Sequence, residues 1–297
     1  MASTRLDGLS AIVTGAGSGL GRAEALELAR SGASVVVNDV AEQAGDVVDE
    51  IEGIGGKAVL VTGDVSERTV ADNLLRTATE RFGGPDIVVN NAGVVRDRML
   101  FNMSDEEFDT VLRVHLRGHF LLCRNAAAHW RQRSKEAGAP VYGRVINTAS
   151  EAFLVGAEGQ PNYAAAKAGI ATLTTSTARA TARYGVRANA ICPRARTAMT
   201  SDVFGSEPPA EGPDPLSADH VTPFVAYLAS PAADRISGQV FVVHGGKIAL
   251  MSPPTVEARF DTTGDGFDAA ELDARLGGYF AERDPDATFA ATEILSL

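Results

Sequence analysis

Residues 11–21 read Ala-Ile-Val-Thr-Gly-Ala-Gly-Ser-Gly-Leu-Gly, a short apolar run that leads into a glycine-rich turn, and an Ala- and Leu-rich stretch follows. The apolar run predicts a buried strand, and the stretch after the turn predicts a helix. Glycines at such a turn let backbone N–H groups and the helix N-terminus face a pyrophosphate. Taken alone, the turn is also compatible with a plain strand-to-helix connection. The residues predicted to cradle a dinucleotide are Gly15, Gly17, Ser18, Gly19, Leu20 and Gly21.

Short runs rich in Val and Ile recur over the first 250 residues, between longer stretches that are compatible with helices. Continuous apolar runs are typical of strands buried on both faces. Their alternation with helices predicts an α/β fold with a doubly wound parallel sheet, that is, a Rossmann-type fold. The predicted strands lie at residues 11–13, 35–37, 58–61, 87–89, 145–146, 188–191 and 240–243.

Two further signals set the bounds of helices and domains. Ser104 and Glu107 form a capping-box pattern, which predicts a long helix that ends before the polar residues 132–143. After residue 250 come two prolines, an acidic Gly-rich stretch and one helix-like segment at 269–280. We therefore predict one dinucleotide-binding catalytic domain, residues 1–250, and a C-terminal extension, residues 251–297, that could serve as a lid or as a subunit contact.

Composition excludes several classes of function. The formal net charge of -11 and the lack of a basic run argue against a nucleic-acid partner. Cys123 and Cys192 have no paired spacing, so they are predicted to be core residues. The sequence has no apolar run of transmembrane length and no signal-peptide pattern at its start, which predicts a cytoplasmic protein without a membrane partner. Residues 261–266 begin like a calcium loop, but Leu272 stands where a Glu is required, so no metal site is expected.

Asp39 closes the second predicted strand, 18 residues after Gly21. An acidic residue near this spacing accepts hydrogen bonds from the ribose hydroxyls of a dinucleotide. Its charge repels a 2′-phosphate, so the sequence favours NAD over NADP as the cofactor. The alternative is that Asp39 is a helix cap or turn former.

Tyr163 and Lys167 lie four residues apart in a predicted Ala-rich helix, so both side chains are expected on one face. A phenol with a pKa near ~10 is a poor acid–base catalyst at neutral pH, and an adjacent ammonium is expected to lower that pKa. Ser150 lies 13 residues before Tyr163, in a loop after a predicted strand. Its hydroxyl is placed to bond a substrate oxygen.

These residues, together with the segments Thr14 to Gly21, Asn90 to Gly93 and Tyr163 to Lys167, resemble the short-chain dehydrogenase/reductase family in order and spacing over about residues 6–250. The resemblance implies that Tyr163 is the general acid–base, that Ser150 polarises the carbonyl, and that Lys167 lowers the tyrosine pKa and binds the nicotinamide ribose. It further implies dimers or tetramers and these cofactor contacts: Asp64 and Val65 with the adenine, and Asn91, Ala92 and Gly93 along the cofactor floor. Asn90 to Gly93 could also be a plain strand-ending turn.

Two positions depart from the family pattern. His115 stands where the family usually has an asparagine that acts partly through its backbone carbonyl, holding a water on a proton relay from the lysine. It is therefore a candidate catalytic residue, and equally a candidate core histidine. Arg194 stands where a glycine usually follows Pro193, and Arg194 and Arg196 could meet phosphates of coenzyme A or be solvated surface arginines.

A narrower resemblance, over residues 35–39, 91–99 and 114–120, is to the dehydrogenase module of peroxisomal multifunctional enzyme type 2, also called 17β-hydroxysteroid dehydrogenase type 4, and its bacterial relatives. It implies oxidation of a small-molecule secondary alcohol to a ketone, or the reverse, the alcohol being a 3-hydroxyacyl-CoA or a 17β-hydroxysteroid. Together with Asp39, it predicts an NAD-dependent enzyme. Apolar residues that could line the cleft are Met99, Leu100, Phe101, Phe153, Leu154, Met199, Val203 and Phe204.

Two alternatives remain. The first is a 3-oxoacyl carrier-protein reductase. Such enzymes usually favour NADP, and Asp39 argues against NADP. A non-catalytic NAD-binding sensor on the same fold is the other, against which the joint presence of Ser150, Tyr163 and Lys167 argues.

Overall fold

The computed structural model describes residues 3–205, 207–209, 212–285 and 287–297, with the backbone alone for residues 202 and 203. The chain divides into two compact units, Met1–Leu250 and Met251–Leu297. No helix in the described ranges is long and apolar enough to cross a membrane.

A single eight-stranded sheet forms the centre of the larger unit, in the order β3-β2-β1-β4-β5-β6-β7-β8. Strands β1 to β7 are parallel, so the predicted doubly wound parallel sheet is confirmed. The last strand was not predicted: it is short, polar at its start and antiparallel to β7 at the sheet edge. The strands are β1 (Ser10–Thr14), β2 (Ser34–Asp39), β3 (Lys57–Thr62), β4 (Ile87–Asn90), β5 (Gly143–Thr148), β6 (Val186–Pro193), β7 (Val240–His244) and β8 (Lys247–Leu250).

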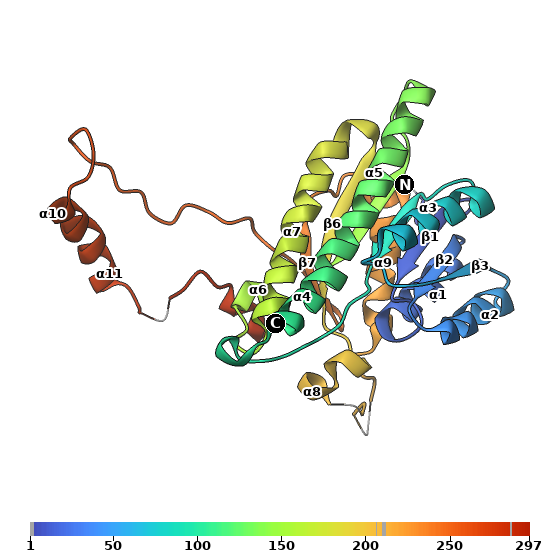
Figure 1. The fold of residues 1–297 in the computed structure, drawn as a ribbon, viewed down its shortest axis with the longest axis horizontal. Helices are drawn as coiled ribbons and strands as arrows, with labels where there is room; N and C mark the ends of the chain where they lie inside the picture. The colour runs from blue at the N-terminus through green and yellow to red at the C-terminus, as the bar shows by residue number, and fades with distance from the viewer. Residues whose placement is uncertain (1–2, 206, 210–211, 286) are drawn as a thin grey trace. The chain divides into compact units, whose positions relative to one another are not determined.

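Helices cover both faces of this sheet (Figure 1), because successive strand residues point to opposite faces. Val13 packs in one core with helices α1 (Gly19–Arg30), α2 (Gly45–Gly53) and α9 (Thr222–Ala229). Ile12 packs in the other core with helices α3 (Arg68–Phe82), α5 (Gly118–Ala137) and α7 (Pro161–Thr181). The short helices of this unit are α4 (Asp105–Leu112), α6 (Ala152–Val155) and α8 (Ser201–Phe204).

The capping box before α4 is confirmed: the Ser104 Oγ accepts the Glu107 N–H, and the Glu107 carboxylate accepts the Ser104 N–H. The predicted continuous helix is interrupted by a π-helical segment, Arg113–Arg117, before α5 begins. Its predicted end was also wrong, because α5 continues through residue 137 and stops where Gly138 adopts a φ of 64°. Charged residues after Gln132 form the solvent face of this helix, while Trp130 and Ser134 bury its other face.

Within the smaller unit, the helix-like segment is α10 (Ala269–Leu272), a π turn at Asp273–Gly277 and α11 (Gly278–Glu282). The Tyr279 ring meets Phe260 edge-to-face, with 5.3 Å between centroids. The Glu257 carboxylate accepts hydrogen bonds from the Tyr279 hydroxyl and the Arg283 guanidinium, each at 2.9 Å.

Glu24 in α1 is a buried carboxyl group with no hydrogen-bond partner among the described residues. Burial raises its pKa to about 8, since a carboxylate is poorly solvated inside a protein. The unfolded chain loses the same proton near pH 4.5. The stability contributed by this group is therefore complete below pH 4.5 and is lost as pH rises through 8.

We therefore expect the Glu24→Gln variant to match the parent below pH 4.5 and to be more stable by roughly 2–4 kcal/mol at pH 8 and above. Urea unfolding of the variant and the parent at several pH values measures this difference in the free energy of unfolding. Glu27→Gln in the same helix is a matched control, because the Glu27 carboxylate is partly exposed and lies 3.8 Å from Arg30. A stability difference for Glu24→Gln that does not widen between pH 5 and 8 would contradict the assignment.

Candidate active site

The carboxyl ends of the parallel strands bring the predicted site residues to one edge of the sheet. The glycine loop follows β1, Asp39 ends β2, and Asp64 comes shortly after β3. Asn91 follows β4, and Ser150 comes shortly after β5. Ligands of doubly wound sheets bind in the crevice outside these strand ends.

The glycine loop fits a dinucleotide phosphate. Gly15 and Gly19 have φ values of 62° and 53°, which favour glycine. A Cβ on Gly21 would overlap the Gly15 carbonyl oxygen and lie 2.5 Å from the Asn91 Nδ2. The Ser18 side chain does not cap α1. The loop thus packs backbone against backbone, and the first-turn N–H groups of α1 remain suited to an anion.

The segment after β4 is tied directly to this loop. The Thr14 Oγ1 accepts the N–H groups of Asn91 and Ala92, at 3.0 and 3.1 Å. The Asn91 amide donates to the carbonyl oxygens of Thr14 and Gly15, at 3.2 and 3.3 Å. Asn91 and Ala92, which are predicted to line the cofactor floor, therefore also support the glycine loop.

The two predicted acidic cofactor contacts differ in their surroundings. The Asp39 carboxylate accepts the Gly17 N–H at 2.9 Å and the Ala41 N–H at 3.1 Å, so it lies beside the glycine loop. The Asp64 carboxylate accepts the Ser66 N–H at 2.8 Å and lies 3.4 Å from the Arg113 guanidinium. Val65 is buried. The adenine contact of Asp64 and Val65 stays a prediction.

Ser150, Tyr163 and Lys167 meet beyond the end of β5. Helix α7 begins at Pro161, which places Tyr163 in its first turn and Lys167 one turn later. Ser150 is near enough to the Tyr163 hydroxyl to lower its pKa. The Lys167 Nζ donates to the Thr148 carbonyl oxygen at 2.5 Å and lies 5.2 Å from the centroid of the Tyr163 ring.

Burial dominates the electrostatics of this group. It raises the pKa of Tyr163 to about 12, and Ser150 opposes that rise only in part. Burial also lowers the pKa of Lys167 to about 7. The net shift of the Tyr163 pKa is therefore upward, because desolvation is its largest cause. The lowering of this pKa by Lys167 stays a prediction.

His115 is buried in the π-helical segment, with its Nε2 2.8 Å from the Val94 carbonyl oxygen and 3.0 Å from the Val94 nitrogen. Its ring meets the Tyr163 ring edge-to-face, at 5.2 Å between centroids. Burial and the nearby Lys167 charge hold the pKa of His115 well below its usual range. The imidazole is thus neutral and in contact with Tyr163, the predicted general acid–base.

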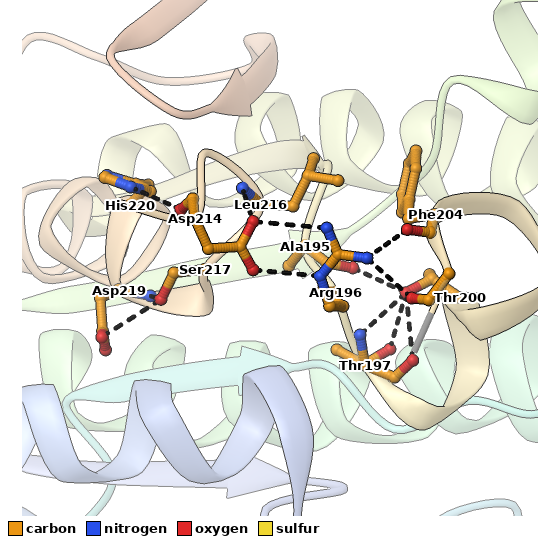
Figure 2. A network of polar contacts seen from close by, with 11 residues as sticks. Ala195, Arg196, Thr197, Thr200, Phe204, Asp214, Leu216, Ser217, Asp219 and His220 are labelled. Atoms are coloured by element: carbon orange, nitrogen blue, oxygen red, sulfur yellow. Dashed lines mark hydrogen bonds and ion pairs between the residues drawn. The ribbon is translucent and has the colours of Figure 1, made fainter. Parts of the chain in front are cut away.

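Arg194 and Arg196 are partly buried and paired with carboxylates in this structure. The Arg194 guanidinium makes two hydrogen bonds of 2.7 Å to Glu151, the residue after Ser150. Figure 2 shows Arg196 bound to Asp214 and to the Phe204 carbonyl oxygen. Its guanidinium also donates to the Gly205 carbonyl oxygen at 2.8 Å. Both arginines therefore brace loops around the site, and the predicted contacts with coenzyme A phosphates lose their basis.

Exposed apolar side chains lie near the site in sequence. Leu100 and Phe101 are 70% and 80% exposed, and Met99 and Met199 are also exposed. Phe153, Leu154 and Phe204 are half-buried, and the Val203 side chain lies outside the described residues.

The sequence did not reveal that Thr14, Glu151 and Asp214 hold the loops around the site in place. Thr14 carries a weak signal, because it is a polar residue at the end of an otherwise apolar strand. Glu151 and Asp214 carry none, because their partners lie 43 and 18 residues away in the chain.

Comparison with known proteins agrees with this geometry. A family model described as short chain dehydrogenase matches residues 10–207. Hydroxyacyl-CoA dehydrogenase ChsB1 of Mycobacterium tuberculosis is 61% identical over 99% of this chain and 95% of its own length. Peroxisomal multifunctional enzyme type 2 of Mus musculus is 38% identical over 83% of this chain and 33% of its own length. A crystal structure of a short chain dehydrogenase from Mycobacterium avium has a TM-score of 0.85 and 44% identity, covering 96% of this chain and 99% of that one.

Strand order, the glycine loop, the Ser150–Tyr163–Lys167 group and these matches agree. The chain is an oxidoreductase that acts on CH–OH groups, and it belongs to the short-chain dehydrogenase family.

Proposed function

We propose that this protein oxidises the 3-hydroxyl group of 3-hydroxyacyl-CoA thioesters to a ketone with NAD, or catalyses the reverse reaction. The observation that carries the chemistry is the meeting of three groups: Ser150, which lowers the pKa of the Tyr163 hydroxyl, Tyr163 itself, and the Lys167 Nζ, 5.2 Å from the centroid of the Tyr163 ring. The 61% identical relative is a hydroxyacyl-CoA dehydrogenase, which supports the thioester as substrate.

The chemistry divides between cofactor and protein. A nicotinamide cofactor held at the glycine loop and the 91–93 segment would supply the hydride acceptor for the carbinol carbon. The Ser150 hydroxyl and the Tyr163 oxygen bind and orient the alcohol oxygen, and Tyr163 in its phenolate form accepts the alcohol proton as the C=O bond forms. In reduction, the protonated Tyr163 gives that proton back to the carbonyl oxygen.

Substrate class is tested by initial rates of NAD reduction on three alcohols: a 3-hydroxyacyl-CoA, the same acyl group on carrier protein, and a 17β-hydroxysteroid. We expect the highest kcat/KM with the CoA thioester. A preference for the carrier-protein thioester would favour the reductase alternative, and a preference for the steroid would replace the acyl substrate. NAD binding without turnover of any alcohol would indicate a sensor.

The preference for NAD is proposed from Asp39, whose carboxylate lies beside the glycine loop. We expect Asp39→Asn to raise the ratio of kcat/KM for NADP to that for NAD by roughly 10–100-fold, because it removes a charge-assisted acceptor for ribose and a charge that repels the 2′-phosphate. Asp46→Asn, at an exposed position in α2, removes the same charge as a matched control. An unchanged cofactor ratio in Asp39→Asn would contradict this assignment.

We also propose a homo-oligomer, a dimer or tetramer, as the resemblance implies. Light scattering measures this directly, and a particle of 31.0 kDa, the mass of one chain, would contradict it.

A further inference from the structure

The His115 side chain lies between two parts of the site that come from different elements. On one side, its Nε2 reaches both polar backbone atoms of Val94. The ring also fills the space above Gly93: a Cβ there would overlap Cε1 and lie 2.9 Å from Nε2. Gly93 has no left-handed φ. Glycine at this position is therefore explained by the imidazole and not by backbone conformation.

The other end of the same segment is also fixed. Thr14 binds the N–H groups of Asn91 and Ala92 through its hydroxyl. Residues 91–94 are thus held by the glycine-loop strand at the start and by His115 at the end. A short backbone segment fixed at both ends has little freedom to shift.

On its other side, the His115 ring stands at 89° to the Tyr163 ring, in edge-to-face contact. Such aromatic pairs contribute energy beyond their buried area and have a preferred geometry. Among the described residues the Nδ1 has no hydrogen-bond partner, and the polar contacts of this buried ring are those of its Nε2 with Val94. The ring therefore links Val94 to Tyr163.

We propose that the His115 side chain is a positioning residue that fixes the separation between the 91–94 segment and the Tyr163 hydroxyl. The Nε2 atom contacts the Val94 backbone, and the ring contacts the Tyr163 ring edge-to-face. This inference rests on the proposed function. In that function, the cofactor beside the 91–94 segment accepts the hydride and Tyr163 transfers the proton, so the distance between the two matters for the reaction. Displacement of reacting groups by about 1 Å can cost about a hundredfold in rate.

The two amide variants of His115 separate a positioning role from simple core packing. The terminal amide of glutamine reaches as far as the imidazole Nε2, and it carries both a donor and an acceptor for Val94. The amide of asparagine, the usual family residue, reaches only as far as Nδ1, which has no partner here. We expect His115→Gln to keep kcat within about threefold, and His115→Asn to lower kcat by about 10–100-fold with little change in KM.

The deuterium isotope effect with a 3-deuterated alcohol is a readout that core packing alone does not move. With kcat normalised to folded, NAD-binding protein, His115→Asn is expected to raise this isotope effect, because chemistry becomes slower than product release. Equal normalised kcat and isotope effects in both amide variants would overturn the inference. If the parent enzyme turns over no alcohol, the proposed function fails instead, so the two failures are distinguishable.

The contact with Gly93 gives a second, independent test. We expect Gly93→Ala to lower kcat in the parent, because the new methyl group must displace the His115 ring. In the His115→Ala background the same change should cost several-fold less, since the ring is gone. Identical losses in both backgrounds would contradict the link between the ring and the 91–94 segment.

Discussion

Replacement of Tyr163 by phenylalanine is expected to lower kcat by about a thousandfold while leaving the fold and NAD affinity unchanged. The change removes only the hydroxyl that exchanges a proton with the substrate oxygen, and positioned general acid–base groups contribute roughly 10²–10⁴-fold. Initial rates measure kcat, and calorimetric titration measures NAD binding.

Tyr142→Phe is the matched control for this substitution. The Tyr142 hydroxyl donates to the Ala229 carbonyl oxygen at 2.5 Å, on the side of the sheet covered by α9. Its loss should cost about 1 kcal/mol of stability and leave kcat unchanged. A Tyr163→Phe enzyme with more than a tenth of the parent's kcat would contradict the role assigned to the hydroxyl.

The direction of the pKa shift at Tyr163 adds a pH dependence. Because burial raises this pKa to about 12, the phenol is protonated throughout the neutral range. Ketone reduction, which uses the protonated form, should keep its rate between pH 6 and 9, whereas alcohol oxidation should become faster as pH rises.

Replacement of Lys167 by methionine is expected to abolish measurable turnover and yet to stabilise the folded protein at neutral pH. The amine is fully buried, and burial lowers its pKa to about 7 from an ordinary 10.5. Below pH 7 both the folded and unfolded chains carry the charge, and the folded chain bears the whole cost of burying it. Between pH 7 and 10.5 only the unfolded chain holds the proton, so the stability of the parent rises with pH.

The expected gain for Lys167→Met is roughly 2–4 kcal/mol at pH 6, shrinking towards pH 10. Loss of the hydrogen bond to the Thr148 carbonyl oxygen offsets about 1 kcal/mol of it. Urea unfolding at pH 6 and pH 10 measures the gain, and Lys57→Met, at an exposed position in β3, is the control. If the stability difference between Lys167→Met and the parent is smaller at pH 6 than at pH 10, burial of the charged amine does not destabilise the parent as proposed.

Local patterns predicted the sheet and the site because their signals are contained in short segments. The apolar strands, the capping box at Ser104 and the four-residue spacing of Tyr163 and Lys167 each depend on neighbours in the chain. The π-helical segment at Arg113–Arg117 gave no such signal, since its sequence is also compatible with a regular helix. The antiparallel β8 is too short and too polar to stand out.

Contacts between distant segments could not be predicted in this way. Arg194 was predicted to face phosphate or solvent, and the structure pairs it with Glu151 across 43 residues. Likewise, the pKa shifts of Tyr163 and Lys167 depend on burial, which a one-dimensional spacing does not reveal. Residue types and spacing thus predict which groups act, while packing determines their charge states.

Deuterium tracing tests the central claim most directly. The enzyme is incubated with NAD and a 3-hydroxyacyl-CoA that carries deuterium on carbon 3, and both products are analysed by mass spectrometry. We predict one deuterium in the reduced nicotinamide for each 3-oxoacyl-CoA formed, and no transfer in Tyr163→Phe above about a thousandth of the parent's rate. Ketone formation without deuterium in the nicotinamide, or no ketone at all, would contradict hydride transfer at this site.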